Sequence, residues 1–218
     1  MSDLFTLAPD APRGLGRALA GGGDKVKRKA FDFYPTPPEA TRAFLRAEGQ
    51  AIARHVQATN ARPALWEPCG YGGAIATVAA AMGWPMVASD LRADPAHDVE
   101  GRDLFDYREA PAPIAVSNPP FALARKMIIH ILTRAQGVTY LALLLKTTFW
   151  NCGESAELAR AGLMPNRRWD VTWRIDFLDQ GNPTMDCAWY VWDMADRAPH
   201  WGLLDRDGAV RIEQGGLI

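Results

Sequence analysis

The residues that most clearly suggest a chemistry are 117–121 (Ser-Asn-Pro-Pro-Phe), which follow an apolar segment at 114–116. Two carbonyl oxygens held close together can accept hydrogen bonds from an exocyclic amine and keep electron density on its nitrogen. Asn118 and Pro119 are placed to supply that pair, and the prolines stiffen the loop so that the acceptors are ordered in advance. Phe121 could stack on the ring that carries the amine. The run is therefore typical of group transfer to a conjugated nitrogen, although a simple turn after a strand is the alternative.

A second group of candidate residues begins with a glycine-rich turn at 67–74 (Glu-Pro-Cys-Gly-Tyr-Gly-Gly-Ala). Glycines let the backbone approach a ligand, and the N-terminus of a following helix offers N–H groups to a carboxylate. Glu67 could act through the amino group of a ligand or through ordered water. Asp90 could accept hydrogen bonds from two ribose hydroxyls, and Asp103 from an adenine amine with Leu104 beside the ring. Each residue also has a structural alternative, because glycine turns occur in many α/β folds and either acid could cap a turn or lie on the surface.

The elements that would position these residues alternate between strand and helix from residue 64 onward. The predicted strands are 64–66, 86–89, 114–117, 138–145, 169–177 and 187–192. The predicted helices are 40–57, 72–82, 123–136 and 155–161. Because two strand-like runs come late and are separated by the loop signal at 179–183, we expect a mostly parallel, twisted sheet that ends in an antiparallel hairpin.

The N-terminal part of the chain differs from the rest in composition. Residues 1–30 combine glycines with a basic run and predict a flexible basic arm, followed by a catalytic domain at 31–218. The basic run could contact phosphates, but a solvated tail is its more common meaning. Next, Thr36 is a plausible N-cap for the first helix, with prolines at the first helical positions and Glu39 placed to complete a capping box.

The whole composition bounds the class of protein. The 218 residues are 48% hydrophobic with a formal net charge of -1, which predicts a globular chain and argues against a globally basic coat for nucleic acid. The three cysteines are Cys69, Cys152 and Cys187. Their spacing is not that of a metal site, so we expect no metal and a reducing compartment. Apolar stretches are too short to span a bilayer and no secretory pattern is present, so we expect a soluble cytoplasmic protein without a membrane partner.

Taken together, these motifs resemble the class I S-adenosylmethionine-dependent methyltransferases, in particular the DNA adenine-N6 type that many phages and prophages encode. The resemblance covers about residues 31–193, including a tryptophan-containing last strand at 186–192, and residues 118–121 are its most specific part. The residues that the resemblance assigns to the cofactor are Tyr34, Pro35, Thr36, Glu67, Pro68, Gly70, Gly73, Asp90, Asp103 and Leu104, and those that it assigns to catalysis are Asn118, Pro119, Pro120 and Phe121.

The resemblance implies a Rossmann-like fold, S-adenosyl-L-methionine as the cofactor and a direct in-line displacement by the adenine amine. A base in duplex DNA would have to leave the stack, with Phe121 and Tyr34 bounding its pocket. The chain departs from the family pattern at Tyr71, which stands where the first glycine of the cofactor loop belongs, whereas Gly73 stands at the second. A shifted turn could compensate, or Tyr71 could crowd the cofactor and weaken its binding.

Recognition of the target is less evident from the sequence. The candidates for contact with DNA are Lys25, Lys27, Arg28, Lys29, Arg167 and Arg168. Relaxed specificity and dependence on a second subunit both stay open. The rival acceptors are RNA adenine and protein glutamine, because their nitrogen is also conjugated and is therefore a poor nucleophile. A further alternative is a non-catalytic DNA-binding or assembly protein with a degraded methyltransferase fold, which Tyr71 favours and which Asn118, Asp90 and Asp103 oppose.

Overall fold

The computed structural model describes residues 34–181, 183 and 185–210, all of which belong to the unit Phe33–Ile218 of the chain. The predicted basic arm at residues 1–30 lies outside the described residues. Within the described part of the chain, none of the helices has the length and apolar content that a bilayer span requires.

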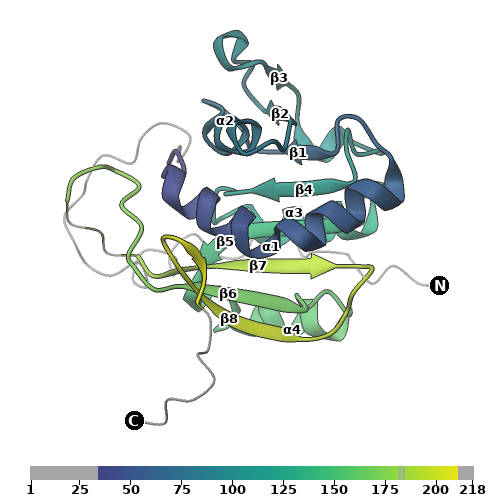
Figure 1. Cartoon of the computed structure of the whole chain (residues 1–218). Helices are drawn as coiled ribbons and strands as arrows, with labels where there is room; N and C mark the ends of the chain where they lie inside the picture. Colours follow the sequence, from purple (N-terminus) through teal and green to yellow (C-terminus); the bar gives the residue numbers. More distant parts are fainter. Residues whose placement is uncertain (1–33, 182, 184, 211–218) are drawn as a thin grey trace, which may run out of the picture. The chain divides into compact units, whose positions relative to one another are not determined.

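A single sheet forms the centre of the described residues, with the strand order β3-β2-β1-β4-β5-β7-β6-β8-β9 (Figure 1). The strands are β1 (Leu65–Glu67), β2 (Met86–Asp90), β3 (Val99–Gly101), β4 (Ile114–Ser117), β5 (Tyr140–Lys146), β6 (Arg167–Val171), β7 (Cys187–Asp193), β8 (His200–Asp205) and β9 (Gly208–Ala209). All pairings among β1 to β5 are parallel, whereas β7 lies antiparallel between β5 and β6. The prediction of a mostly parallel sheet with a C-terminal antiparallel hairpin is therefore confirmed.

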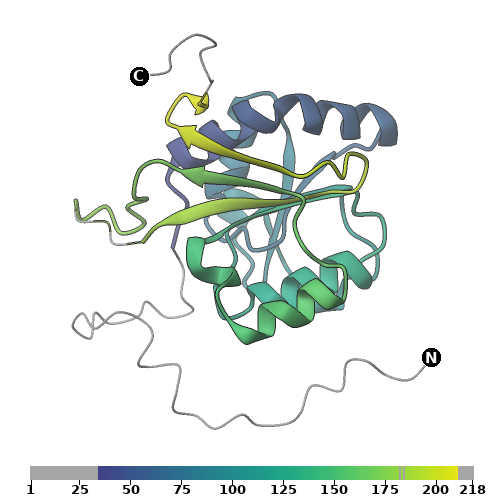
Figure 2. The same cartoon turned by 90° about the horizontal axis from the view of Figure 1, so that it is seen from below.

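Helices cover both faces of this sheet (Figure 2). The α-helices are α1 (Pro38–Thr59), α2 (Ala74–Ala81), α3 (Ala124–Thr133) and α4 (Gly153–Arg160), and short 3-10 helices are η3 (Pro95–His97), η4 (Leu104–Asp106) and η5 (Thr147–Trp150). Alternate residues of a strand point to opposite faces. Thus Leu65 joins the core beneath α1 and α2, whereas Trp66 joins the core beneath α3 and α4.

The start of α1 differs from the prediction. The helix begins at Pro38, its N-cap is Pro37, and no side-chain hydrogen bond caps it, so the prediction of Thr36 as N-cap is wrong. Thr36 is instead buried. Pro38 has one fewer unpaired N–H group and a φ that already suits a helix, and Ala40 N–H donates to the Pro37 carbonyl at 3.1 Å, so the first turn forms without a polar side-chain cap.

Three strands, β3, β8 and β9, were not expected from the sequence. The short β3 holds only three residues, and β9 only two. In β8 the side chain of Leu204 is buried, while Trp201 is 70% and Leu203 is 42% exposed. Because β8 lacks regular alternation of buried and exposed residues, its pairing with β6 is set by tertiary contacts rather than by local pattern.

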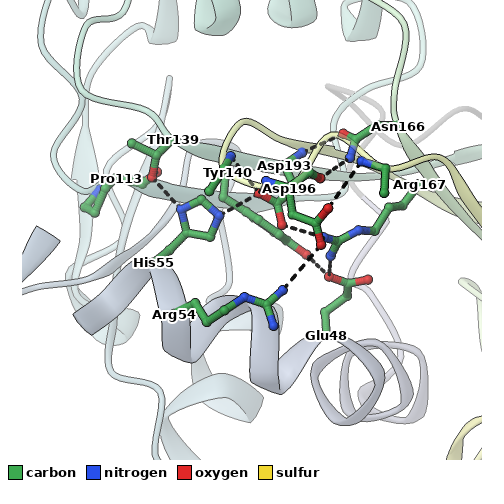
Figure 3. A network of polar contacts seen from close by, with 12 residues as sticks. Glu48, Arg54, His55, Pro113, Thr139, Tyr140, Asn166, Arg167, Asp193 and Asp196 are labelled. Carbon is green, nitrogen blue, oxygen red and sulfur yellow. Dashed lines mark hydrogen bonds and ion pairs between the residues drawn. The ribbon is translucent and has the colours of Figure 1, made fainter. Parts of the chain in front are cut away.

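A buried polar network joins α1 to the sheet (Figure 3). Arg167 donates from Nη1 to Glu48 Oε2 at 2.7 Å and from Nη2 to Asp193 Oδ2 at 2.6 Å. The Tyr140 hydroxyl donates to Glu48 Oε2 at 2.9 Å, and His55 Nε2 lies 2.9 Å from Asp193 Oδ1. Burial opposes the charge of Arg167, but the Glu48 and Asp193 carboxylates outweigh it and raise the pKa of Arg167. The network therefore locks α1 onto β5, β6 and β7.

This network corrects one sequence prediction. Arg167 points into the interior and is occupied by two buried carboxylates, so the prediction that it contacts DNA is wrong. Arg168, the next residue of β6, points to the opposite face and pairs with Asp170 at 2.7 Å. Through β7 and β5, Arg167 is in register with Val116 of β4 and Arg168 with Ser117, so both arginines are separated from the loop after β4 by the width of two strands.

Candidate active site

The predicted site residues follow the carboxyl ends of neighbouring parallel strands (Figure 1). With the strand order β3-β2-β1-β4-β5, the residues that leave this edge of the sheet are, in order, Asp103, Asp90, Glu67, Asn118 and Lys146. Between β1 and β4 the direction of chain winding reverses, and ligands of doubly wound sheets bind at such a point. The fold therefore brings the candidate cofactor residues to one side of the reversal and the candidate catalytic loop to the other.

The loop after β4 has a defined orientation of its amide side chain. Asn118 Nδ2 donates to the backbone carbonyl of Tyr34 at 3.2 Å. A carboxamide carries its donor on one side and its acceptor on the other, so this bond directs Oδ1 away from the Tyr34 carbonyl. The Pro120 carbonyl accepts from Leu123 N–H at 2.8 Å and closes the turn into α3. Two segments 84 residues apart in the sequence thus cooperate to present an oriented amide oxygen.

Aromatic side chains flank this loop. Phe121 is partly buried against the core beneath α3, and Lys146 Nζ lies 5.1 Å from the centroid of its ring. At the end of β5, Phe149 and Trp150 of η5 pack edge to face with ring centroids 5.2 Å apart. The sequence analysis did not single out these two aromatic residues, because only the tertiary structure brings the end of β5 beside the end of β4.

The glycine-rich turn shows why it contains three glycines. Gly72 has a φ of 77° and Gly73 a φ of 59°, both in the left-handed region, whereas Tyr71 does not have a positive φ. At Gly70 an added Cβ would lie 2.9 Å from the Cβ of Ala88, so a side chain there would collide with β2. The backbone of the turn therefore requires no glycine at position 71.

Glu67 is a buried acid between β1 and α2. Its Oε2 accepts from Ala76 N–H at 2.9 Å, so the helix N-terminus that was expected to face a ligand carboxylate also serves this side chain. Burial, supplemented by the negative charge of Asp90, raises the pKa of Glu67 from 4.5 to about 8, while the N–H groups of Ala76 and Ile75 act in the opposite direction. Glu67 consequently holds a proton over much of the neutral range.

The two acids that follow β2 and β3 each cap a local turn. Asp90 Oδ1 accepts from Arg92 N at 3.0 Å and from Arg92 Nε at 3.2 Å. Asp103 Oδ1 accepts from Phe105 N at 2.9 Å and is the N-cap of η4, where Leu104 is buried. A carboxylate has about four acceptor positions, so capping a turn and binding a ligand are compatible roles for either acid.

Electrostatic effects at Cys69 show that these acids converge. Burial is the main reason that the pKa of the Cys69 thiol rises to about 12, and the negative charges of Asp90, Glu67 and Asp103 raise it further. Three carboxyl groups from three different strand ends therefore act on one residue of the glycine-rich turn. The carboxylates of Asp90 and Asp103 in this region suit a ligand that carries a cation together with hydroxyl or amine donors.

The structure places the other predicted residues as follows. Tyr34 and Pro35 precede α1 and meet the catalytic loop through the Tyr34 carbonyl, whereas Arg167 and Arg168 lie on β6, which β5 and β7 separate from β4. Lys25, Lys27, Arg28 and Lys29 lie outside the described residues. Among residues 34–181, 183 and 185–210, no group of three or more His, Cys, Asp or Glu side chains is arranged to hold a metal ion.

Comparison with known proteins bears on the fold. No family model and no curated protein matches this sequence. The chain is similar in structure to a Pyrococcus horikoshii protein provisionally assigned as an RNA methyltransferase, with a TM-score of 0.51, 12% identity and coverage of 75% of this chain and 87% of that chain.

Two further solved structures are more distant. The methyltransferase subunit of a type I restriction-modification system from Streptococcus thermophilus has a TM-score of 0.49 and 9% identity, with 80% of this chain and 47% of that chain covered, so the present chain spans about half of its length. A Listeria monocytogenes protein provisionally assigned as a class I S-adenosylmethionine-dependent methyltransferase has a TM-score of 0.47 and 11% identity, with 78% of this chain and 65% of that chain covered. The strand order and the similarity to the Pyrococcus horikoshii structure show that the described residues adopt a Rossmann-like methyltransferase fold, as the sequence predicted.

Proposed function

We propose that this protein is an S-adenosyl-L-methionine-dependent methyltransferase that methylates the N6 amine of adenine in DNA. The observation that carries the proposal is the bond from Asn118 Nδ2 to the Tyr34 carbonyl. It leaves the amide oxygen of Asn118 as an oriented acceptor at the carboxyl end of β4, next to the carbonyl of Pro119. Two carbonyl oxygens in a stiff loop can hold an exocyclic amine without reorganisation during the reaction.

The neighbouring pocket fits the proposed methyl donor. Gly70 allows close approach of the loop backbone to β2, and the charges of Asp90, Glu67 and Asp103 all contribute to raising the pKa of Cys69. Asp90 would accept from the ribose hydroxyls and Asp103 from the adenine amine, while Leu104 would border the ring. When bound, S-adenosylmethionine supplies an electrophilic methyl group on a positively charged sulfur.

The side chains of this protein would bind, orient and desolvate the acceptor. Asn118 Oδ1 and the Pro119 carbonyl would accept hydrogen bonds from the two N–H groups of the amine, which would keep its lone pair available for the methyl group. The donor, held by Asp90 and Asp103, would supply the methyl group for the new nitrogen–carbon bond, and the electron pair of its carbon–sulfur bond would remain on sulfur. One amine proton then leaves through the acceptors or solvent, and Phe121 would stack on the base.

The choice of DNA adenine over other acceptors rests on sequence features. The segment before α1, beginning at Tyr34, and the tryptophan-containing strand β7 both resemble DNA methyltransferases of phage type. RNA adenine and protein glutamine are the rival acceptors because the same pair of carbonyl oxygens serves any planar nitrogen. A second subunit would supply target recognition if the described domain binds DNA weakly by itself.

A transfer assay with a tritiated methyl donor tests the proposal. The wild-type protein is offered unmethylated DNA, RNA and protein in separate reactions, and the modified nucleoside or residue is identified. We expect N6-methyladenine in DNA. Label that enters only RNA or protein would reject the proposed acceptor, and absence of both transfer and donor binding would favour a non-catalytic protein with a degraded site.

Asn118→Ala is the matched catalytic variant. Loss of one preorganised hydrogen-bonding group in an active site typically lowers turnover by about 10²–10³-fold. We expect that loss of methyl transfer with donor binding unchanged, as measured by calorimetry, because Asn118 lies on the β4 side of the site. Equal loss of donor affinity and transfer would place Asn118 in the donor pocket instead.

A further inference from the structure

We infer that Arg92 is a positioning residue for the methyl donor. It orients the Asp90 carboxylate and holds the Tyr71 ring against the exit of β2, so that the donor loop accommodates an aromatic residue. This inference rests on the proposed function, because it concerns the binding of the donor at that same site.

The contacts of Arg92 link two parts of the donor pocket. Its Nε donates to Asp90 Oδ1 at 3.2 Å, its backbone N–H donates to the same oxygen at 3.0 Å, and its Cζ lies 3.8 Å from the centroid of the Tyr71 ring. The side chains of Arg92 and Asp90 are 28% and 14% exposed. Partial exclusion of water strengthens both the ion pair and the cation–π contact relative to a fully exposed site.

The segment after β2 fixes the glycine-rich turn residue by residue. Gly70 N–H donates to the Ser89 carbonyl at 2.9 Å, and Gly72 N–H donates to Asp94 Oδ2 at 3.2 Å. The Tyr71 ring between them is covered by Arg92. The residues after β2 therefore contact three consecutive residues of the turn. Gly70 and Gly72 are held through their backbone N–H groups, and Tyr71 is held through its ring.

The contacts of Arg92 with Asp90 orient this carboxylate without blocking its access to the donor. Both contacts from Arg92 use Oδ1, whereas a carboxylate offers about four acceptor positions. Two ribose hydroxyls can therefore be accepted while Arg92 stays in place. The ion pair fixes the rotamer of Asp90 before the donor arrives, which lowers the entropic cost of binding.

The role of Arg92 explains how Tyr71 is tolerated. The turn takes its left-handed conformations at Gly72 and Gly73, so Tyr71 affects the donor only through its ring. Without Arg92 that ring loses the cation–π contact that holds it at the β2 exit, so its preferred position shifts toward Asp90. Loss of Arg92 should therefore weaken donor binding chiefly when a bulky residue is present at position 71.

A double-mutant cycle tests this dependence in the full-length protein. Calorimetry with S-adenosylmethionine is carried out on the wild type, Arg92→Ala, Tyr71→Ala and the double variant. Alanine is suitable at position 71 because that residue does not have a positive φ. We expect Arg92→Ala to raise the Kd at least tenfold, Tyr71→Ala to change it less than threefold, and the double variant to return to within about threefold of Tyr71→Ala.

Steady-state kinetics provides a second readout that a general loss of folding would not mimic. Arg92→Ala should raise the KM for the donor while kcat at saturating donor stays within twofold, since Arg92 lies on the β2 side and not at the catalytic loop. Circular dichroism and thermal unfolding establish that each variant is folded.

Other outcomes separate this inference from the proposed function. Tighter donor binding by Arg92→Ala would mean that Arg92 competes with the donor for Asp90, and additive effects of the two substitutions would mean that Tyr71 and Arg92 act independently. Either result, or an unchanged Kd, overturns the positioning role while the proposed function stands. Absence of donor binding by the wild-type protein would overturn both.

Discussion

At the scale of the residue, Glu67 couples the donor pocket to protonation. The carboxyl group is 3% exposed and accepts from the first turn of α2, and burial raises its pKa to about 8. In the unfolded chain the same group titrates near 4.5. At pH values between 4.5 and about 8, Glu67 is protonated in the folded protein and ionised in the unfolded chain.

This difference fixes the sign of a pH effect on stability. Between pH 4.5 and 8 the folded state binds more protons than the unfolded state. The contribution of Glu67 to the free energy of unfolding is therefore fully present below pH 4.5 and is lost as pH rises toward 8. The slope for one group reaches about 1.4 kcal/mol per pH unit. We expect the free energy of unfolding of Glu67→Gln to fall less than that of the wild type between pH 5 and 8, as measured by urea denaturation.

The glutamine variant is a matched control because it keeps a carbonyl oxygen for Ala76 N–H and does not titrate. All other groups titrate similarly in both proteins, so the difference between the two curves isolates Glu67. Parallel curves over this pH range would show that Glu67 is already ionised in the folded protein.

At the scale of the element, α1 is held by buried charge as well as by apolar packing. Glu48 on α1, Arg167 on β6 and Asp193 on β7 form one ion network whose side chains are 2%, 9% and 1% exposed. The chain that enters α1 carries Tyr34, whose carbonyl orients Asn118. Anchoring of α1 therefore supports the candidate active site through the segment that enters the helix.

Arg167→Met should destabilise the protein strongly. Removal of one partner of a buried ion pair leaves uncompensated charge and typically costs about 3–5 kcal/mol. The control is Arg168→Met, since that arginine pairs with Asp170 on the other face and its side chain is 38% exposed. Such partly exposed pairs contribute about 0–1 kcal/mol.

Chemical denaturation of both variants measures this difference. A clear gap in the free energy of unfolding between Arg167→Met and Arg168→Met supports the role of the network. Similar values would mean that Met at position 167 replaces the ion network by equally favourable apolar packing.

A comparison of predicted and observed strand bounds shows which elements the local sequence pattern predicts correctly. The strand at 114–117 was predicted with its observed bounds because a short apolar run followed by Asn-Pro-Pro marks both its burial and its end. Predicted strand 169–177 instead ends at Val171 and begins at Arg167. A charged residue is not expected inside a buried strand, and only the carboxylates of Glu48 and Asp193 make Arg167 acceptable there.

At the scale of the whole molecule, the candidate donor and catalytic residues lie between Tyr34 and Phe121, whereas the basic run at residues 25–29 precedes them. The described cations near the catalytic edge include several that are paired, such as Arg174 with Asp186 at 3.1 Å and Arg206 with Glu39 at 3.9 Å. We therefore expect the basic run to contribute a separate, electrostatic part of DNA binding.

Replacement of Lys25, Lys27, Arg28 and Lys29 by glutamine tests this expectation. Each phosphate contact contributes about 0.9 to the slope of log affinity against log salt concentration for duplex DNA. We expect weaker DNA binding and a smaller salt slope in a fluorescence titration, with unchanged affinity for S-adenosylmethionine. An unchanged salt slope would assign DNA contact to the domain at 31–218 alone.

The alternation of strands and helices, the stiff Asn-Pro-Pro-Phe loop and the candidate acids could be predicted from the sequence, because they depend on local pattern and residue chemistry. Which of these groups meet depends on the tertiary structure. It joined Asn118 to the Tyr34 carbonyl, placed Arg92 between Asp90 and Tyr71, and buried Arg167 rather than leaving it for DNA. These outcomes depend on strand order and on contacts between residues far apart in the chain, which no local sequence pattern encodes.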